Sequence, residues 1–276
     1  MTDRRLWPAN DRVALRSLGL TDRVAVDGTP ARLSRSVTDL CRSPGGARER
    51  QLLLGENVTT LEFQNGWAFV QTENGYCGYV AADRLDNIHW PTHRVSTFGT
   101  HAYTSETMKS EPTMALPFGA RLRVIDERPK FFETPQGFVP KKHLRPLDRP
   151  FADPVNVAQL HFNVPYLWGG NSTRGIDCSG LIHAALTACD IPCPGDADLQ
   201  EAALGDALSP DAPLQRGDLI FWPGHVGMMV DEQVMIHANA HAMACVYEPI
   251  DNAILRIKTQ GDGDVSSRRR LTERAG

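Results

Sequence analysis

Short apolar stretches alternate with turn signals in two segments of the first half of the chain. Within residues 51–85, turns rich in Asn and Gly recur every 9–10 residues, a spacing typical of a meander of short strands. Residues 116–144 repeat this arrangement: the letters GFV at 137–139 stand where GYV stands at 78–80, about 60 residues earlier. We therefore predict two duplicated β modules.

The pattern changes after a charged, Pro-rich segment at 145–153. In residues 180–188, apolar side chains recur at every third or fourth position, which predicts an amphipathic helix. Asp177 stands just before this helix and is a preferred residue type for its N-cap. The chain is therefore expected to change from strands alone to a mixture of helix and strand.

Further short strands separated by turn signals are predicted beyond this helix. A polar segment of about 25 residues, rich in Pro and Gly, is predicted as a loop. The run SSRRR at 266–270 is predicted as a solvated, disordered end, with a partner-binding tail as the alternative. The predicted strands are 219–222, 225–230, 234–238 and 253–257.

Length and composition shifts suggest the domain organisation. A chain of 276 residues has room for one large domain or two to three small ones, at about 100–200 residues each. Two similar modules are too few for a repeat solenoid, so we expect each to fold as a small barrel or sandwich. The predicted division is an N-terminal extension at 1–30, β modules at 31–90 and 91–147, and a third domain at 148–276.

Charge and composition argue against several classes of function. The formal net charge is −4, which speaks against a basic nucleic-acid-binding surface. The first 20 residues carry 6 charged side chains, and no apolar run has the length of a signal-peptide core or a membrane helix. We therefore expect a cytoplasmic protein that does not enter the membrane. Six cysteines in 276 residues are too few for a disulfide scaffold.

Cys178 is the first candidate for chemistry. It would stand in the first turn of the predicted helix, where unpaired backbone N–H groups and the helix dipole stabilise a thiolate. These groups would lower the pKa of the thiol toward neutrality, and the same N–H groups could hold an oxyanion. The alternative is a buried cysteine that packs as a small apolar side chain.

Two histidines strengthen the catalytic interpretation. His225 begins one predicted strand and His237 lies on the next, 12 residues later. In a tight hairpin an even separation places both side chains on one face of the sheet, within about 4.5–8 Å of each other. A cysteine at a helix N-terminus beside two such histidines fits a nucleophile, a base and a residue that orients the base. Each histidine taken alone would more often be structural.

A metal site is the competing interpretation of the same region. Cys189 and Cys193 are separated by three residues, whereas zinc sites normally use pairs such as C-x2-C or H-x3-H. We therefore expect Cys189 and Cys193 to be packing thiols, and we expect no metal and no other cofactor.

At this point the residues resemble those of a known family. The segments YLWGGNSTRGIDCSGL at 166–181 and RGDLIFW with GHVGMMV within 216–230 resemble the cysteine and histidine motifs of NlpC/P60 cysteine peptidases. HANA at 237–240 resembles the motif of the family's third catalytic residue. With two bacterial SH3-like modules in front, the likeness extends over roughly 30–260, and the chain resembles the γ-D-glutamyl-L-diamino-acid endopeptidases of murein-peptide recycling.

The resemblance implies a fold and three catalytic roles. The fold would be α+β, with a papain-like NlpC/P60 catalytic domain preceded by two small SH3-like β-barrels. Cys178 would attack the carbonyl carbon of the γ-D-glutamyl bond. His225 would take the thiol proton and return it to the leaving amine, and His237 would orient the imidazole of His225.

The resemblance also implies residues that hold the substrate. In the recycling subgroup, a tyrosine of the first SH3-like module and an aspartate after the catalytic helix bind the free α-amine, and the matching positions are Tyr76 and Asp196. Ser179 and Trp168 match positions that line the family's cleft. A carboxylate built to pair with an ammonium would reject N-blocked peptidoglycan, because it would be left unpaired.

Several points in this amine pocket stay open. The subgroup often has Arg before the aspartate, where this chain has Gly195. Tyr76 could instead be a core aromatic of the β module, and Asp198 could replace the neighbouring aspartate as the amine ligand. Glu49 or Glu56 of the first module could add a second carboxylate, and the sequence does not choose between them.

The sequence thus predicts a cytoplasmic cysteine endopeptidase that cuts the γ-D-glutamyl–diamino acid bond of free murein peptides with an unblocked N-terminal L-Ala. The expected partner is a murein tri- or tetrapeptide, with no nucleic acid and no membrane. One alternative is a secreted hydrolase that acts on intact wall through wall-binding SH3-like modules. Another is a catalytically silent module that only binds wall peptides.

Overall fold

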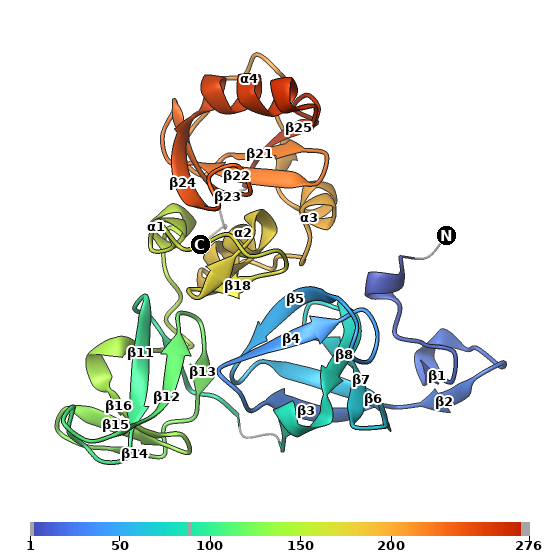
Figure 1. Ribbon diagram of the computed structural model, residues 1–276, viewed down its shortest axis with the longest axis vertical. Helices are drawn as coiled ribbons and strands as arrows, with labels where there is room; N and C mark the ends of the chain where they lie inside the picture. Colours follow the sequence, from blue (N-terminus) through green and yellow to red (C-terminus); the bar gives the residue numbers. More distant parts are fainter. Residues whose placement is uncertain (1–2, 88–89, 272–276) are drawn as a thin grey trace. The chain divides into compact units, whose positions relative to one another are not determined.

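The computed structural model describes residues 3–87 and 90–271 and divides into two compact units, Met1–Arg149 and Pro150–Gly276 (Figure 1). The first unit is built of short strands and 3-10 turns. In its described residues, the second unit combines four α-helices with strands. The change in pattern at 145–153 thus coincides with the change of unit.

The N-terminal segment folds back onto the first β module. Strands β1 (Val13–Leu15) and β2 (Val24–Val26) pair in parallel, next to the 3-10 turns η1 (Arg4–Leu6) and η2 (Arg16–Leu18). Val13 is buried in a cluster with Leu61, Phe69 and Cys77. The polar appearance of residues 1–30 therefore conceals an apolar contact with the module that follows.

The first β module is a seven-stranded sheet in the order β5-β4-β8-β7-β6-β3-β9. The predicted meander is confirmed in β6, β7 and β8, which pair consecutively and antiparallel. Gly66 (φ 79°) and Gly75 (φ 84°) supply the left-handed backbone that the two connecting turns need. The strands are β3 (Thr29–Leu33), β4 (Val37–Cys41), β5 (Arg48–Leu53), β6 (Asn57–Gln64), β7 (Trp67–Thr72), β8 (Cys77–Ala81) and β9 (Leu85–Asp86), with η3 (Ala82–Arg84) before the last.

The second β module contains a three-stranded sheet, β13-β10-β17, and a five-stranded sheet, β12-β11-β16-β15-β14. Val95, Leu116, Leu122 and Val139 are buried in its core, and Leu54 of the first module joins the same cluster. The strands are β10 (His93–Val95), β11 (Gly99–Tyr103), β12 (Pro112–Pro117), β13 (Arg121–Leu122), β14 (Asp126–Glu127), β15 (Phe131–Thr134), β16 (Gly137–Pro140) and β17 (Leu144–Pro146), with η4 (Lys141–His143) before the last.

The prediction of two closed barrels is not confirmed. In the part of the chain that the structure describes, no sheet closes on itself: the hydrogen-bonded order of the first module ends at β5 and β9, and the second module splits into two sheets. A closed barrel needs its first and last strands to pair across the full circle. Here β9 has only two residues and pairs with β3 alone, so it leaves the sheet open.

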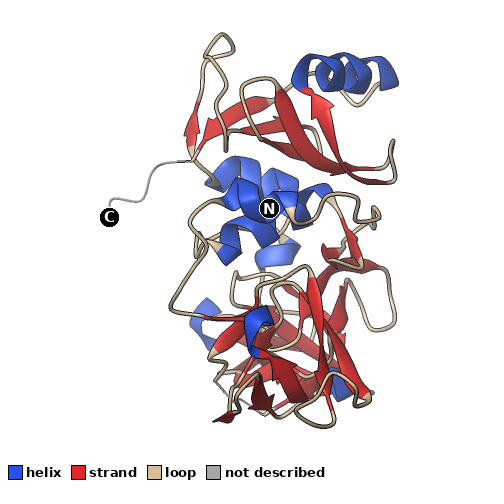
Figure 2. Ribbon diagram, turned by 90° about the vertical axis from the view of Figure 1, so that its left-hand side faces the viewer, coloured by secondary structure: helices blue, strands red, loops and turns tan. Residues whose placement is uncertain are grey.

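The C-terminal unit is built around a six-stranded sheet in the order β20-β25-β21-β22-β23-β24. Helix α4 covers one face of this sheet, and helices α1, α2 and α3 lie on the other side (Figures 1 and 2). Its strands and helices are α1 (Pro154–Gln159), β18 (Asn171–Ser172), β19 (Gly175–Ile176), α2 (Cys178–Ala188), α3 (Ala197–Ala203), β20 (Asp206–Ala207), β21 (Leu219–Trp222), β22 (His225–Met229), β23 (Val234–Asn239), β24 (Ala244–Pro249), α4 (Ile250–Gln260) and β25 (Ser267–Arg270).

The predicted helix and its cap are confirmed in α2. Asp177 occupies the N-cap position, and its side chain accepts a hydrogen bond from the backbone N–H of Gly180. The helix is less amphipathic than expected, because Ile182 and Leu186 are fully buried together with Leu181 and Ala185. Helix α2 is therefore a central core helix, which holds its first residue, Cys178, in a fixed place.

The strand predicted at 253–257 is wrong, because this segment lies within helix α4. Ile250, Ala253 and Ile257 recur at three- and four-residue intervals, and all three pack onto the sheet. This is the period of a helix with one buried face. The prediction of a continuous loop after α2 is also wrong in part, because the segment contains α3 and β20.

The run SSRRR is not a disordered end. Residues 267–270 form β25, which pairs with β21 on one side and with β20 on the other. Arg270 donates from Nε and Nη2 to the two carboxylate oxygens of Asp218, at 2.8 and 2.7 Å. Long arginine side chains can pack their stems against the sheet and keep their charged ends paired, so a basic sequence is compatible with an inner strand.

The longest of the described helices, α2 and α4, have 11 residues each. None of the helices in the described part of the chain is long and apolar enough to cross a membrane.

Candidate active site

Asp177 organises the N-terminus of α2. Its Oδ1 accepts from the backbone N–H of Gly180 (2.6 Å) and from the hydroxyl of Ser179 (3.1 Å), while Oδ2 accepts from the N–H of Gly169 (2.8 Å). One carboxylate thus caps the helix and holds the Gly-rich loop against it. Close packing enforces this contact, because a methyl group on Gly180 would overlap the carbonyl oxygen of Gly170.

Cys178, the first residue of α2, lies against strand β22. Its side chain is only 7% exposed, and its Sγ lies 3.9 Å from the carbonyl oxygen of Gly224. The backbone N–H of Val226 also points to this sulfur. The sulfur therefore contacts both chain neighbours of His225.

The expectation of a lowered thiol pKa is wrong. Burial raises the pKa of Cys178 to about 12, and the negative charge of Asp177 adds to the rise. The backbone N–H groups of Val226, Ser179 and Cys178 act in the predicted direction and lower the pKa, but they are outweighed. A sequence shows the helix N-terminus but not the loss of water around it.

His225 and His237 lie on one face of the β22–β23 hairpin, as their spacing predicts. His225 Nε2 and His237 Nδ1 are 2.9 Å apart, and the ring centroids are 5.2 Å apart. Strand β22 pairs with β23 only at Met228 and Met229. A Cβ at Gly227 would overlap Cε of Met235 and come within 3.2 Å of Cβ of His237, so only glycine fits this close packing of β22 on β23.

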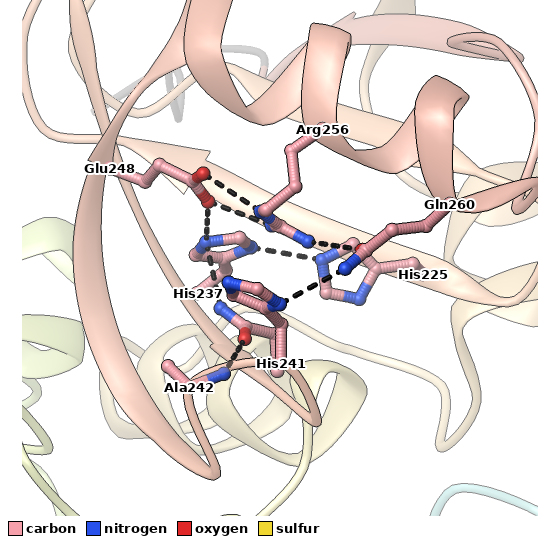
Figure 3. Close-up of polar contacts among 8 residues, drawn as sticks. His225, His237, His241, Ala242, Glu248, Arg256 and Gln260 are labelled. Atoms are coloured by element: carbon pink, nitrogen blue, oxygen red, sulfur yellow. Dashed lines mark hydrogen bonds and ion pairs between the residues drawn. The ribbon is translucent and has the colours of Figure 1, made fainter.

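A carboxylate and a guanidinium extend this network beyond His237, and the sequence pattern predicted neither of them. His237 Nε2 lies 2.9 Å from Oε2 of Glu248 on β24 (Figure 3). Arg256 on α4 donates from Nε to Oε1 (2.9 Å) and from Nη2 to Oε2 (2.8 Å) of the same carboxylate. Since β24 was not predicted and α4 was predicted as a strand, no spacing rule could bring these residues to the histidines.

The groups at one end of this chain of contacts are neutral, and those at the other end are ionised. Burial lowers the pKa of His225 to about 3, and burial likewise lowers the pKa of His237. The hydrogen bond from Arg256, with one from His237, lowers the pKa of Glu248 to about 2. Near neutral pH, two uncharged imidazoles therefore lie between a thiol and an ionised carboxylate.

Asp196 is the N-cap residue of α3. Gln200 links this residue to the first turn of α2: its backbone N–H donates to the carbonyl of Asp196 (2.8 Å), and its side-chain Nε2 donates to the carbonyls of Ser179 (2.9 Å) and Pro194 (3.1 Å). Asp196 is half-buried and the alternative ligand, Asp198, is exposed. The segment that carries Asp196 is thus tied to the first turn of α2.

The remaining cleft candidates differ in exposure. Ser179 is 7% exposed and donates its hydroxyl to Asp177, whereas Trp168 is 71% exposed. Tyr166, at the start of the cysteine motif, has its pKa raised by burial and by the charges of Cys178 and Asp177. A tyrosine hydroxyl therefore lies within electrostatic reach of the nucleophile.

Among the candidates in the N-terminal unit, Tyr76 is buried, and Glu49 and Glu56 are partly buried. Tyr76 is 2% exposed, and the guanidinium carbon of Arg50 lies 5.3 Å from its ring centroid. Glu49 forms an ion pair with Arg4. Glu56 accepts a hydrogen bond from the N–H of Leu53 at 3.1 Å, and burial raises its pKa. Their participation in an amine pocket stays a prediction.

Cys189 and Cys193 are buried free thiols. Cys193 Sγ lies 3.5 Å from Nε2 of Gln200 and 3.4 Å from the carbonyl oxygen of Pro194. Among residues 3–87 and 90–271, no group of three or more His, Cys, Asp or Glu side chains is arranged to hold a metal ion.

Comparison with known families assigns the unit that contains this site. Residues 163–261 match the NlpC/P60 family, and residues 40–85 match the bacterial dipeptidyl-peptidase SH3 domain. The chain carries an NlpC/P60 domain. The NlpC/P60 match includes Cys178, His225, His237 and Glu248, so the whole contact chain belongs to this domain.

Two curated relatives resemble much of the chain. The gamma-D-glutamyl-L-lysine dipeptidyl-peptidase of Bacillus cereus is 27% identical over 227 residues, covering 69% of this chain and 67% of that protein. The protein of the same name from Bacillus subtilis is 26% identical over 218 residues, covering 69% of this chain and 72% of that protein. These two dipeptidyl-peptidases, together with the NlpC/P60 match, support the assignment of the chain as a hydrolase.

A solved structure supports the fold. The crystal structure of an NlpC/P60 family protein from Bacillus cereus superimposes with a TM-score of 0.74 at 21% sequence identity, covering 89% of this chain and 100% of that chain. The fold of an NlpC/P60 domain preceded by an SH3 domain is thus shared.

Proposed function

We propose that this protein is a cysteine endopeptidase that hydrolyses the γ-D-glutamyl–diamino acid bond of free murein peptides with an unblocked N-terminal L-Ala. The observation that carries the proposal is the position of Cys178 at the N-terminus of α2, against the strand that bears His225, with His237 bonded to the second nitrogen of that imidazole. The names of the two Bacillus relatives support this bond type.

The geometry supports a nucleophilic mechanism with a general base. Cys178 Sγ attacks the γ-carbonyl carbon, and His225 accepts the thiol proton as the S–C bond forms. Because thiol and imidazole are both neutral at rest, this proton transfer accompanies the attack. The carbonyl oxygen takes the negative charge, for which the backbone N–H groups at the start of α2 are suitable donors.

The tetrahedral intermediate then collapses and the C–N bond breaks. The leaving amine receives the proton from His225, and the D-glutamyl group remains on Cys178 as a thioester. Water attacks the thioester carbonyl while His225 takes its proton. The S–C bond breaks, the acid product leaves, and the thiolate regains a proton from His225, which restores the resting enzyme.

Substrate selection in this proposal rests on the free amine. We assign Asp196 and Tyr76 to the L-Ala ammonium, and Ser179 and Trp168 to the cleft. A carboxylate that replaces the water around an ammonium gives a strong, charge-assisted hydrogen bond. The same carboxylate would stay unpaired with an N-acylated peptide, which disfavours intact wall as substrate.

The setting of the reaction follows from this substrate. Peptides with bare amines are freed fragments, so we assign the enzyme to recycling of murein peptides in the cytoplasm. We also assign residues 91–147 to a second SH3-like module, on the basis of the repeated GYV and GFV segments.

The test compares two forms of the substrate. L-Ala-γ-D-Glu-meso-diaminopimelate and its L-lysine counterpart are incubated with the protein, each free and N-acetylated, and the products are separated by chromatography. We expect the free peptides to be cut at the γ-glutamyl bond and the N-acetylated peptides to be cut at least about 100-fold more slowly. Cys178→Ala should cut neither, with an unchanged melting temperature.

Three outcomes would contradict the proposal. Equal cleavage of free and N-acetylated peptides would favour a hydrolase of intact wall. Binding of the peptides without cleavage by the unmodified protein would favour a wall-peptide binding module. Full activity of Cys178→Ala would remove the assigned nucleophile.

A further inference from the structure

Two polar groups compete for one ring nitrogen of His237. Its Nε2 lies 2.9 Å from Oε2 of Glu248 and 3.0 Å from Nδ2 of Asn239. The carboxylate oxygen can only accept a hydrogen bond, whereas the amide nitrogen can only donate one. A proton on Nε2 satisfies Glu248, and a bare Nε2 satisfies Asn239. The ring cannot satisfy both.

The amide of Asn239 is held in this orientation. Its Oδ1 accepts from the backbone N–H of Ala242 at 2.8 Å, and the residue is only 7% exposed. Turning the amide over would place its NH2 group against that backbone N–H and leave two donors facing each other. The NH2 group therefore stays directed at the ring of His237.

The charge on Glu248 decides the competition. Arg256 contacts both carboxylate oxygens and keeps the pKa of Glu248 at about 2, so the group is ionised near neutral pH (Figure 3). Burial lowers the pKa of His237, so its ring is neutral and has one N–H to place. An ionised oxygen 2.9 Å from a bare ring nitrogen would be strongly repelled, whereas a neutral amide loses only one weaker hydrogen bond.

We propose that Glu248 is a positioning residue that holds the proton of His237 on Nε2 against the competing amide of Asn239. The proposal deepens the proposed function and rests on it for the role of His225.

The position of the proton on His237 also determines which nitrogen of His225 is free to act as a base for Cys178. With its proton on Nε2, His237 has a bare Nδ1 that accepts from Nε2–H of His225 at 2.9 Å. His225 then keeps a bare Nδ1, the nitrogen that remains to take the thiol proton of Cys178. Without Glu248, Asn239 would donate to Nε2 and the proton of His237 would move to Nδ1. The proton of His225 would in turn move to its Nδ1 and block it as a base.

The variants separate this role from simple packing. The double variant Glu248→Leu/Arg256→Leu removes the acceptor without leaving a lone charge. The triple variant adds Asn239→Asp to these two changes. This third change replaces the competing donor by an acceptor and keeps the contact with the N–H of Ala242. Lys258→Leu is the matched control, because it removes a cation of the same helix that pairs with exposed Asp264, at 2.8 Å.

The first readout needs no substrate. Ring 15N spectra of the histidine-labelled protein identify which nitrogen of His237 and His225 carries the proton. We expect Nε2–H on both rings in the unmodified protein and in Lys258→Leu, Nδ1–H in the double variant, and Nε2–H again in the triple variant. Nδ1–H on His237 in the unmodified protein would overturn the proposal, and this measurement stands even if the variants do not fold.

The second readout is the reactivity of the Cys178 thiol, measured by alkylation and by cleavage of the peptide. We expect the rate of iodoacetamide alkylation and the kcat/KM for the free murein peptide to fall about 100-fold or more in the double variant. Both should recover at least about tenfold on adding Asn239→Asp. A double variant with unchanged proton positions and an unchanged rate would end the proposal. If proton positions and alkylation follow the expectation but no murein peptide is cut, the proposed function fails and the positioning role of Glu248 stands.

Discussion

Gln200 connects the nucleophile to the proposed substrate ligand. Its side chain has no exposed surface and donates from Nε2 to the carbonyls of Ser179, next to Cys178, and of Pro194, near Asp196. A buried carbonyl without a donor is costly, so this one amide sets the distance between two functional segments. Specificity and chemistry are thus coupled through a side chain that contacts neither substrate nor nucleophile in the proposed mechanism.

Gln200→Leu should weaken both stability and substrate binding. Leucine fills much of the same space but donates nothing, so the two carbonyls lose their donor, at about 1–3 kcal/mol for a buried unpaired group. We expect the free energy of unfolding in urea to fall by about 2 kcal/mol and KM for the free peptide to rise more than kcat falls. An unchanged KM would show that Gln200 does not position Asp196.

At the scale of elements, a buried ion pair reinforces the backbone pairing of β25 in the sheet. Asp218 is 1% exposed, and both of its oxygens accept from Arg270. The neighbouring Arg269 pairs through its backbone with β21 and β20, and no carboxylate among the described residues forms an ion pair with it. The strand is therefore attached to the sheet by its backbone hydrogen bonds and by the ion pair of Arg270 with Asp218.

Arg270→Met should destabilise the protein far more than Arg269→Met. Both changes keep an apolar stem on the strand, but only the first leaves the buried carboxylate of Asp218 without its guanidinium. Because the carboxylate of Asp218 is buried, we expect the midpoint of urea unfolding to fall clearly for Arg270→Met and much less for the control. Equal losses measured by urea unfolding would contradict this role of the pair.

At the scale of the whole molecule, buried neutral histidines make folding depend on pH. His161 is 1% exposed and hydrogen-bonded to the carbonyl of Val157 at 3.1 Å, and burial lowers its pKa to about 4. His225 and His237 shift in the same direction. A lowered pKa means that the unfolded chain binds more protons than the folded chain between the two pKa values.

Stability should therefore be complete above about pH 6.5 and fall as the pH drops toward 4. Each buried histidine contributes a slope of up to about 1.4 kcal/mol per pH unit in this window. Replacing His161 by Leu should remove one such contribution, so the free energy of unfolding of the variant should change less between pH 6 and 4.5. Urea unfolding at several pH values measures this pH dependence. An identical slope in the variant and the unmodified protein would refute the contribution of His161.

The sequence by itself determined those contacts of the candidate site in which both residues lie close together along the chain. Asp177 caps α2 three residues before the N–H that it binds, and His225 meets His237 across one hairpin of known period. The strands β21, β22 and β23 follow from short apolar runs that turn signals separate. Short-range geometry is enough here, because helix and hairpin periods fix which side chains share a face.

Only the tertiary structure decided what surrounds these residues. Glu248 and Arg256 reach His237 because β24 and α4 fold back over the hairpin, and a helix of one buried face resembles a short strand when five residues are considered alone. The pKa of Cys178 rises for a related reason: burial is the sum over every segment packed around the sulfur, whereas the sequence shows only the helix that begins there. Sequence periodicity thus placed Cys178 and the two histidines, and long-range packing set their pKa values.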